Sequence, residues 1–233
     1  MNEHTSKRFD AEMEALRGGV LEMGGLVEAQ LAHAITALGD EEAGPMDEVG
    51  AVEQRINQMQ MTLDHQCSQV IARRQPAAID LRMLLTITKI VNDLERTGDE
   101  IKKIAYKAVE ARGSAALAQV RRHDAARTAS QARETLRMAL DAFARLDVNT
   151  AAVVIARDEE IDAAFLAILR QLISYMMEDP RTIGPAIEIV FIAKAIERIG
   201  DHAKNIAEAV IQVVRGKDVR HATADEIRAE TSE

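Results

Sequence analysis

The chain has 233 residues, 47% of them hydrophobic, which is enough for one large domain or two small ones with a substantial core. Aromatic residues make up only 3%, Trp is absent and good helix formers dominate, which favours an all-α protein. The net charge of -9 argues against a nucleic-acid-binding protein, because binding the phosphate backbone needs a basic surface. The single cysteine, Cys67, excludes an internal disulfide and a CxxC metal site, and we expect it in the core.

The N-terminal segment MNEHTSKRFD is polar and lacks the apolar stretch of a secretory signal. No apolar run approaches the roughly 18–20 residues that a membrane span needs. Both features predict a cytoplasmic protein.

Helical periodicity runs through almost the whole chain, and a few glycines and prolines interrupt it. Pro76 ends the second periodic segment, Gly113 and Ser114 separate the third from the fourth, and Gly216 ends the sixth. Pro185 falls in the first turn of the sixth segment, where proline is tolerated. The predicted helices cover about 6–39, 47–75, 79–112, 117–145, 150–178 and 182–215.

Two segments 102 positions apart are nearly identical: ERTGDEIKKIA at 95–105 and ERIGDHAKNIA at 197–207. They occupy the second halves of the third and sixth predicted helices. Similar acidic segments also open the second and fifth helices, VEQRIN at 52–57 and RDEEID at 157–162. Duplication of a three-helix unit explains this pattern most simply.

The fold that we predict is therefore two tandem antiparallel three-helix bundles related by a pseudo-twofold axis. The first repeat covers residues 1–113 and the second covers 114–216. A short charged C-terminal tail, 217–233, follows them.

Each repeat carries polar side chains four positions apart, which places them on one helix face. The pairs are Glu53 with Asn57, Glu95 with Asp99, Asp158 with Asp162, and Glu197 with Asp201. Like charges at this spacing repel one another unless something neutralises them. One interpretation is a solvated face that is neutralised by Lys102, Lys103 and Lys204, which follow the aspartates by three or four positions.

A bound metal is the other interpretation, because packing of the two helices in each repeat would bring four such side chains together. Oxygen ligands favour Mg²⁺, Mn²⁺, Ca²⁺ or iron over a Cys/His zinc site. Gly98 and Gly200 lie between the paired carboxylates, although a glycine inside a helix costs about 1 kcal/mol relative to alanine. The missing Cβ would let either an ion or a neighbouring helix approach closely.

Four side chains are candidates for a supporting role at such a site: Asn57, Asp80, His202 and Asn205. Asn205 lies one turn beyond Asp201. For Asp80 a favourable interaction with the helix dipole is the simpler explanation, and for His202 an exposed or hydrogen-bonded histidine. The methionines are expected to fill the core, namely Met59, Met61, Met83, Met138, Met176 and Met177.

The sequence contains no GxGxxG, P-loop, HExxH or GxSxG motif. It also lacks the E-x-x-H motif of di-iron carboxylate enzymes. The sequence therefore predicts no catalytic site.

Four segments carry a resemblance to a known family: QPAAIDLR, NDLERTGDEIKKIA, MMEDPRTI and AIERIGDHAKNIAE. With them the sequence resembles the PhoU family from about Phe9 to Gly216. The resemblance implies two three-helix bundles whose E(D)xxxD motifs line metal clusters of iron, zinc or another ion such as manganese or magnesium. The matching positions here are Glu53, Glu95, Asp99, Asp158, Asp162, Glu197 and Asp201. Asn57 departs from the acidic pattern, so the cluster of the first repeat is expected to be the poorer one.

The resemblance also implies a signal adaptor without catalysis. Such a protein keeps the sensor histidine kinase PhoR inactive when phosphate is plentiful, and so represses the phosphate-starvation (Pho) response. It contacts the ATPase subunit PstB of the phosphate transporter, restrains phosphate uptake, commonly forms a homodimer and reaches the membrane only through its partners.

Two alternatives stay open. One is a PhoU-like regulator of a different transporter. The other is a metal-dependent phosphate-ester hydrolase, for which the sequence offers no evident base or nucleophile.

Overall fold

The computed structural model describes residues 2–39, 47–110, 116–220, 222 and 226, and within these ranges it contains helices and no strands. Six α-helices and one short 3₁₀ helix follow one another along these described ranges. Their bounds are α1 Asn2–Gly39, α2 Asp47–Arg74, α3 Ala78–Glu110, α4 Ala116–Arg145, α5 Val148–Glu178, η1 Pro180–Thr182 and α6 Ile183–Arg215.

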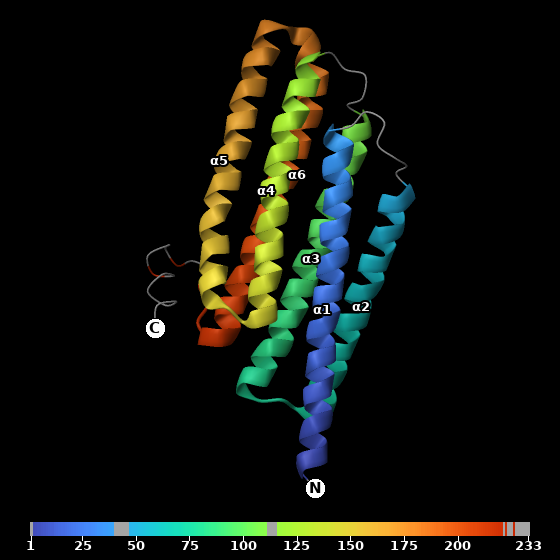
Figure 1. Cartoon of the computed structure of the whole chain (residues 1–233), viewed down its shortest axis with the longest axis vertical. Coiled ribbons are helices and arrows are strands. Elements are labelled where there is room, and N and C mark those ends of the chain that lie inside the picture. Colours follow the sequence, from blue (N-terminus) through green and yellow to red (C-terminus); the bar gives the residue numbers. More distant parts are fainter. Residues whose placement is uncertain (1, 40–46, 111–115, 221, 223–225, 227–233) are drawn as a thin grey trace.

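The helices form two bundles that lie side by side, α1 with α2 and α3, and α4 with α5 and α6 (Figure 1). The bundles meet where α3 packs against α6 and α1 packs against α4. The helices α5, α6, α3 and α2 therefore form one layer, and α4 and α1 cover one side of it. Each helix of the first bundle has a counterpart in the second, as a pseudo-twofold axis requires. The predicted fold class is confirmed.

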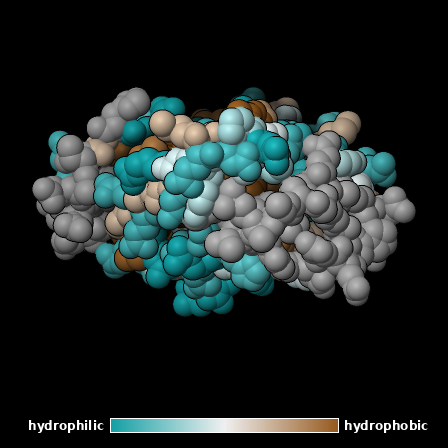
Figure 2. Space-filling view, turned by 90° about the horizontal axis from the view of Figure 1, so that it is seen from above, coloured by the Kyte–Doolittle hydropathy of each residue, from teal (hydrophilic) through white to brown (hydrophobic). Residues whose placement is uncertain are grey.

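The core follows the helical spacing of apolar side chains. On α3, for example, Leu84, Ile87, Val91 and Leu94 are fully buried. Burial of such a side chain stabilises the fold by about 1.5–3 kcal/mol relative to exposure. Hydrophilic residues cover most of the coloured surface at the end of the molecule that Figure 2 shows, with hydrophobic residues appearing between them.

Cys67 is buried, as predicted, and burial raises the pKa of its thiol to about 11. The thiol therefore stays protonated near neutral pH. Two methionine predictions are wrong, because Met61 is 66% exposed and Met177 is 81% exposed. Helical spacing predicts which residues share a helix face, but it does not predict which faces another helix covers.

Helix ends agree with the sequence to within a few residues. α5 begins two residues earlier than predicted because Asp147 caps it: its carboxylate accepts hydrogen bonds from the backbone N–H groups of Asn149 and Thr150. α1 begins at Asn2 rather than near residue 6. Gly216 ends α6 in the left-handed conformation, with φ 75°, which glycine adopts without strain.

The 3₁₀ turn before α6 was not predicted; Pro180 opens it and the Asp179 side chain caps it. The predicted break at Gly113 and Ser114, and with it the boundary between the repeats, lies outside the described residues, as does most of the tail 217–233. Among the described residues, no helix combines the length and hydropathy needed to cross a membrane.

Candidate metal centre

Three carboxylates from two helices converge in the second bundle. Asp158 and Asp162 lie one turn apart on α5, and Asp201 faces them from α6. One oxygen from each lies within 4.8 Å of the others. Asp158 is only 2% exposed, whereas Asp162 and Asp201 are partly exposed. Oxygens at this spacing suit a single hard cation.

The fourth predicted ligand of this repeat, Glu197, lies one turn before Asp201 on α6. Two oxygens at the site are buried without a hydrogen-bond partner in the described part of the chain: Asp158 Oδ1 and Glu197 Oε2. The other oxygen of each accepts a hydrogen bond from a lysine, Lys204 at 2.8 Å and Lys194 at 2.5 Å. A buried charged oxygen without a partner is costly, and a metal ion would supply that partner. The donor set therefore fits a metal.

Burial and mutual repulsion raise the pKa of both Asp162 and Asp201. Desolvation is the largest cause for each carboxyl. The negative charges of Asp158 and Glu197 add to it. The protein alone therefore stabilises the ionised forms poorly, and a bound cation would reverse the effect.

The lysines that follow each motif do not hydrogen-bond to the aspartate of their own helix, although the charges of Lys102 and Lys204 still interact with Asp99 and Asp201. Lys204 reaches across to Asp158 on α5, and Lys102 reaches across to Glu53 on α2 at 2.6 Å. Lys103 binds Glu100 instead. The solvated-face interpretation is thus wrong in its pairing, because the neighbouring helix lies close enough to take the lysine.

The corresponding residues of the first bundle lie along α2 and α3. Burial raises the pKa of Glu95, and the charges of Asp99 and Glu53 raise it further. Among the described residues, however, no three carboxylates of this bundle come as close together as those of the second. Asn57 stands at the place of Asp162, so one carboxylate is replaced by an amide. The tighter cluster is the one that lacks this substitution.

The two glycines differ in how closely the neighbouring helix approaches them. A Cβ added to Gly200 would lie 3.0 Å from Ile161 Cδ1 and 3.3 Å from Asp158 Oδ1. At Gly98 the nearest atom, Ile56 Cδ1, would be 3.5 Å away. Helix packing therefore explains Gly200, which also keeps space beside an oxygen of the cluster, whereas a Cβ at position 98 would make only an ordinary contact.

Two of the supporting candidates face away from the cluster. His202 Nδ1 lies 3.0 Å from Asp93 Oδ1, and Asn205 Nδ2 donates to the same oxygen at 3.1 Å. Both side chains thus join α6 to α3 at the contact between the bundles. Neither side chain therefore supports the cluster of Asp158, Asp162 and Asp201, and for that cluster the prediction is wrong. The charge of His202 does act on Glu95 of the first bundle, where it opposes the upward shift of the Glu95 pKa.

Asp80 is exposed in the first turn of α3, 19 residues before Asp99. At 1.5 Å per residue the two are separated by about 28 Å along the helix. Asp80 therefore does not contact the cluster of the first bundle, which corrects that prediction too.

The sequence motifs did not indicate a role for Asp93. Its counterpart in the second repeat, 102 positions later, is Ala195, so comparing the copies shows where the duplication has diverged. The counterpart of His202 is Glu100, which binds Arg198 across the contact. The polar contacts between α3 and α6 therefore differ in the two halves.

Comparison with known proteins places this arrangement in a family. The PhoU domain matches residues 20–108 and again residues 126–210. The phosphate-specific transport system accessory protein PhoU homolog of Pseudomonas putida is 44% identical, with 99% of this chain and 90% of that protein aligned. The phosphate-specific transport system accessory protein PhoU of Escherichia coli K12 is 39% identical, over 97% of this chain and 93% of that protein.

Solved structures give the same result. The crystal structure of PhoU from Pseudomonas aeruginosa matches with a TM-score of 0.84 at 44% identity, covering 90% of this chain and 100% of that one. The phosphate transport system regulatory protein PhoU from Streptococcus pneumoniae matches with a TM-score of 0.80 at 26% identity, covering 91% and 99%. The sequence, the duplicated helical units and these matches agree: the chain belongs to the PhoU family.

Proposed function

We propose that this protein is an accessory regulator of a phosphate-specific transport system, which represses the phosphate-starvation response and restrains phosphate uptake. The observation that carries the proposal is the end-to-end match to accessory proteins of that name at 39–44% identity. In this proposal the protein works in the cytoplasm without catalysing a reaction. It acts as a homodimeric adaptor between the kinase PhoR and the transporter subunit PstB.

We further propose that the α5–α6 cluster binds a divalent or trivalent ion such as iron, zinc, manganese or magnesium. Asp158, Asp162, Asp201 and Glu197 would hold it, and its charge would relieve the repulsion among them. Glu53, Glu95 and Asp99 form the corresponding, weaker site. The carboxylates of α5 and α6 would then be joined by the ion, and this stiffened helical hairpin would present one conformation to a partner.

The test of the regulatory role is an alkaline phosphatase reporter of the starvation response, measured in high phosphate. A strain without the gene should show the reporter on, and the wild-type gene should turn it off. Silence of the reporter in the deletion strain, in the absence of a second copy of the gene, would reject the phosphate-regulator role.

The same reporter tests whether the cluster matters. We expect an Asp162→Asn/Asp201→Asn variant to leave the reporter at least partly on. The matched control is Glu159→Gln/Glu160→Gln, which changes the charge of the protein equally at two exposed positions of α5. Full repression by both variants, with circular dichroism showing folded protein, would contradict a role for the cluster.

A further inference from the structure

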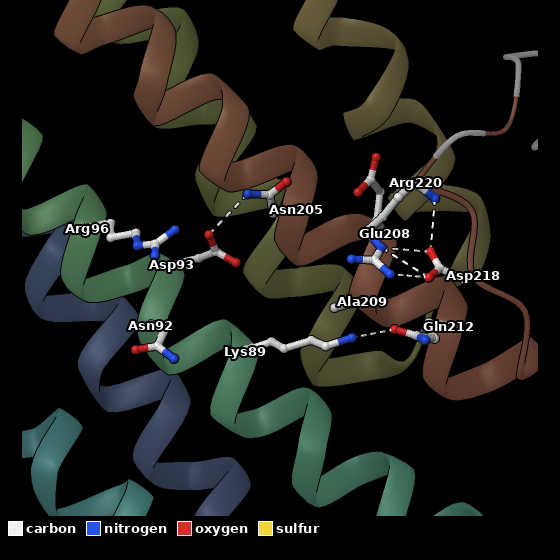
Figure 3. A pocket seen from close by; sticks show the side chains of 10 residues that line it. All are labelled: Lys89, Asn92, Asp93, Arg96, Asn205, Glu208, Ala209, Gln212, Asp218 and Arg220. Atoms are coloured by element: carbon white, nitrogen blue, oxygen red, sulfur yellow. Dashed lines mark hydrogen bonds and ion pairs between the residues drawn. The ribbon is translucent and has the colours of Figure 1, made fainter.

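A hollow of about 320 Å³ lies between α3 and α6, next to the segment that follows α6 (Figure 3). Its floor includes Ala209. Lys89 and Gln212 lie along one edge, Arg96 lies on one side, and Arg220 lies on the other. Side chains from three segments thus surround one space.

The duplication provides an internal comparison for this hollow. Shifted by 102 positions, the counterpart of Ala209 is Lys107 and that of Lys89 is Phe191. In that half of the molecule the Lys107 ammonium lies 5.8 Å from the centre of the Phe191 ring and pairs with Glu188 at 2.9 Å. Equivalent helices therefore carry large side chains at one place and a hollow at the other. The difference comes from side-chain choice rather than from the fold.

The cations around the hollow differ in how far they are already neutralised. Arg220 Nε lies 2.9 Å from an oxygen of Asp218, so this charge is paired. Lys89 donates to the neutral side-chain oxygen of Gln212 at 2.8 Å. Arg96 makes no hydrogen bond or ion pair with any residue that the structure describes. Lys89 and Arg96 therefore keep charge available for an anion.

Three acidic side chains also line the hollow: Asp93, Glu208 and Asp218. Asp218 is paired with Arg220, and Asp93 accepts a hydrogen bond from Asn205. Glu208 is only 8% exposed and makes no hydrogen bond within the described ranges. Desolvation raises the pKa of this carboxyl, against the opposing effect of Lys204. A buried carboxylate beside cations accepts a hydrogen bond only from a ligand that carries a proton.

We propose that this hollow binds inorganic phosphate, whose dianion still carries one P–OH group at neutral pH. Lys89 and Arg96 contact its oxygens, and Glu208 accepts the hydrogen bond of its P–OH group. Sulfate carries no proton at neutral pH, so it leaves Glu208 unsatisfied next to a second negative charge. A site built around such a hydrogen bond rejects the analogue that lacks it. This site does not depend on the proposed adaptor role and goes beyond it.

Isothermal titration calorimetry of the full chain with phosphate, glycerol 2-phosphate and sulfate, at constant ionic strength, tests the proposal. Phosphate should bind at least about tenfold more tightly than sulfate and than glycerol 2-phosphate, because a phosphate monoester, with its second pKa at about 6, has also lost its P–OH proton at neutral pH. Lys89→Gln and Arg96→Gln should each weaken binding by about tenfold or more, since each removes a charged hydrogen bond. Ala209→Lys, which copies the other half, should abolish binding by filling the hollow.

Glu208→Gln is the most specific variant, because an amide can donate to an oxyanion. We expect it to narrow the preference for phosphate over sulfate. Lys103→Gln, an equal change of charge at an exposed position of α3, should leave binding unchanged.

Phosphate that binds through a metal at the carboxylate cluster would give a different pattern. Phosphate binding would then be lost in the Asp162→Asn/Asp201→Asn variant and retained in the Lys89→Gln variant. This pattern would overturn the proposal. The absence of phosphate binding, or equal binding of sulfate or of the ester, would overturn it as well.

Discussion

At the scale of single residues, the unusual feature is a set of carboxylates that the protein neutralises incompletely. Helix geometry made their grouping predictable, because residues four apart always share a face. Their partners were not predictable in this way. Which carboxylate Lys204 reaches depends on the register between α5 and α6, and that register is set by packing around Gly200.

The free energy of unfolding, measured with a chelator so that no metal is bound, should reveal this incomplete neutralisation. The carboxyls of Asp162 and Asp201 have pKa values above the 3.8 of an unperturbed aspartate, so between these values the folded state binds more protons than the unfolded state. Stability therefore falls as the pH rises through this window. Asp162→Asn/Asp201→Asn removes the effect, so the variant should be more stable than wild type at pH 7, by roughly 0.5–1 kcal/mol.

Urea unfolding from pH 4 to pH 8 measures this difference. The advantage of the variant should shrink as the pH falls toward 4, because the wild-type carboxyls then take up protons and repel one another less. A variant that is less stable than wild type at pH 7, or a difference that does not change with pH, would contradict the description of these carboxylates.

Asn57 permits the opposite test, a gain of function. Asn57→Asp restores a carboxylate at the place equivalent to Asp162, so we expect tighter Mn²⁺ binding by the first bundle. Equilibrium dialysis with Mn²⁺ should show the additional binding. Gln58→Glu adds the same charge at the next, exposed position. An equal effect of both substitutions would mean that charge alone, and not the site, attracts the ion.

At the scale of elements, the length and order of the six helices were predictable because glycine and proline separate long periodic segments. The exposure of individual side chains was not predictable in this way. Met61 and Met177 lie at helical spacings, but on helix faces that no neighbouring helix covers. The 3₁₀ turn at Pro180 depends on local hydrogen bonds of Asp179 that helical periodicity does not reveal. Close approach of a neighbouring helix was one of two explanations for the glycines, and the structure supports it for Gly200, between α5 and α6, but not for Gly98.

Substituting the two glycines compares this packing in the two repeats. Gly98→Ala should stabilise the protein by about 0.5–1 kcal/mol, because alanine favours the helix and its Cβ meets Ile56 at an ordinary distance. Gly200→Ala should gain less or destabilise, because its Cβ crowds Ile161 and Asp158. Denaturant unfolding of both variants with a chelator present gives the two values. A larger gain at Gly200 than at Gly98 would show that α5 and α6 are not packed this closely.

At the scale of the whole molecule, the duplicated sequence was sufficient to predict two related bundles. It did not predict how they join. The contact of α3 with α6 is held by pairs such as Asp93 with His202 and Glu100 with Arg198, which are not repeated in the two halves. The two halves also differ beside this contact: a polar hollow lies near Ala209 in one half, and the side chain of Lys107 occupies the equivalent place in the other. The pseudo-twofold axis thus relates the two bundles, and these contacts are the places where the two halves of the protein differ.

The most direct test of the metal-bearing scaffold is the metal content of protein purified without chelators, measured by inductively coupled plasma mass spectrometry. We expect about one tightly bound ion per chain at the α5–α6 cluster. Asp158→Asn/Asp162→Asn/Asp201→Asn should lose it, whereas Glu159→Gln/Glu160→Gln/Glu178→Gln, an equal charge change at exposed sites of α5, should keep it. Wild-type protein that stays empty after incubation with iron, zinc or manganese, or a triple asparagine variant that keeps its ion, would contradict the account.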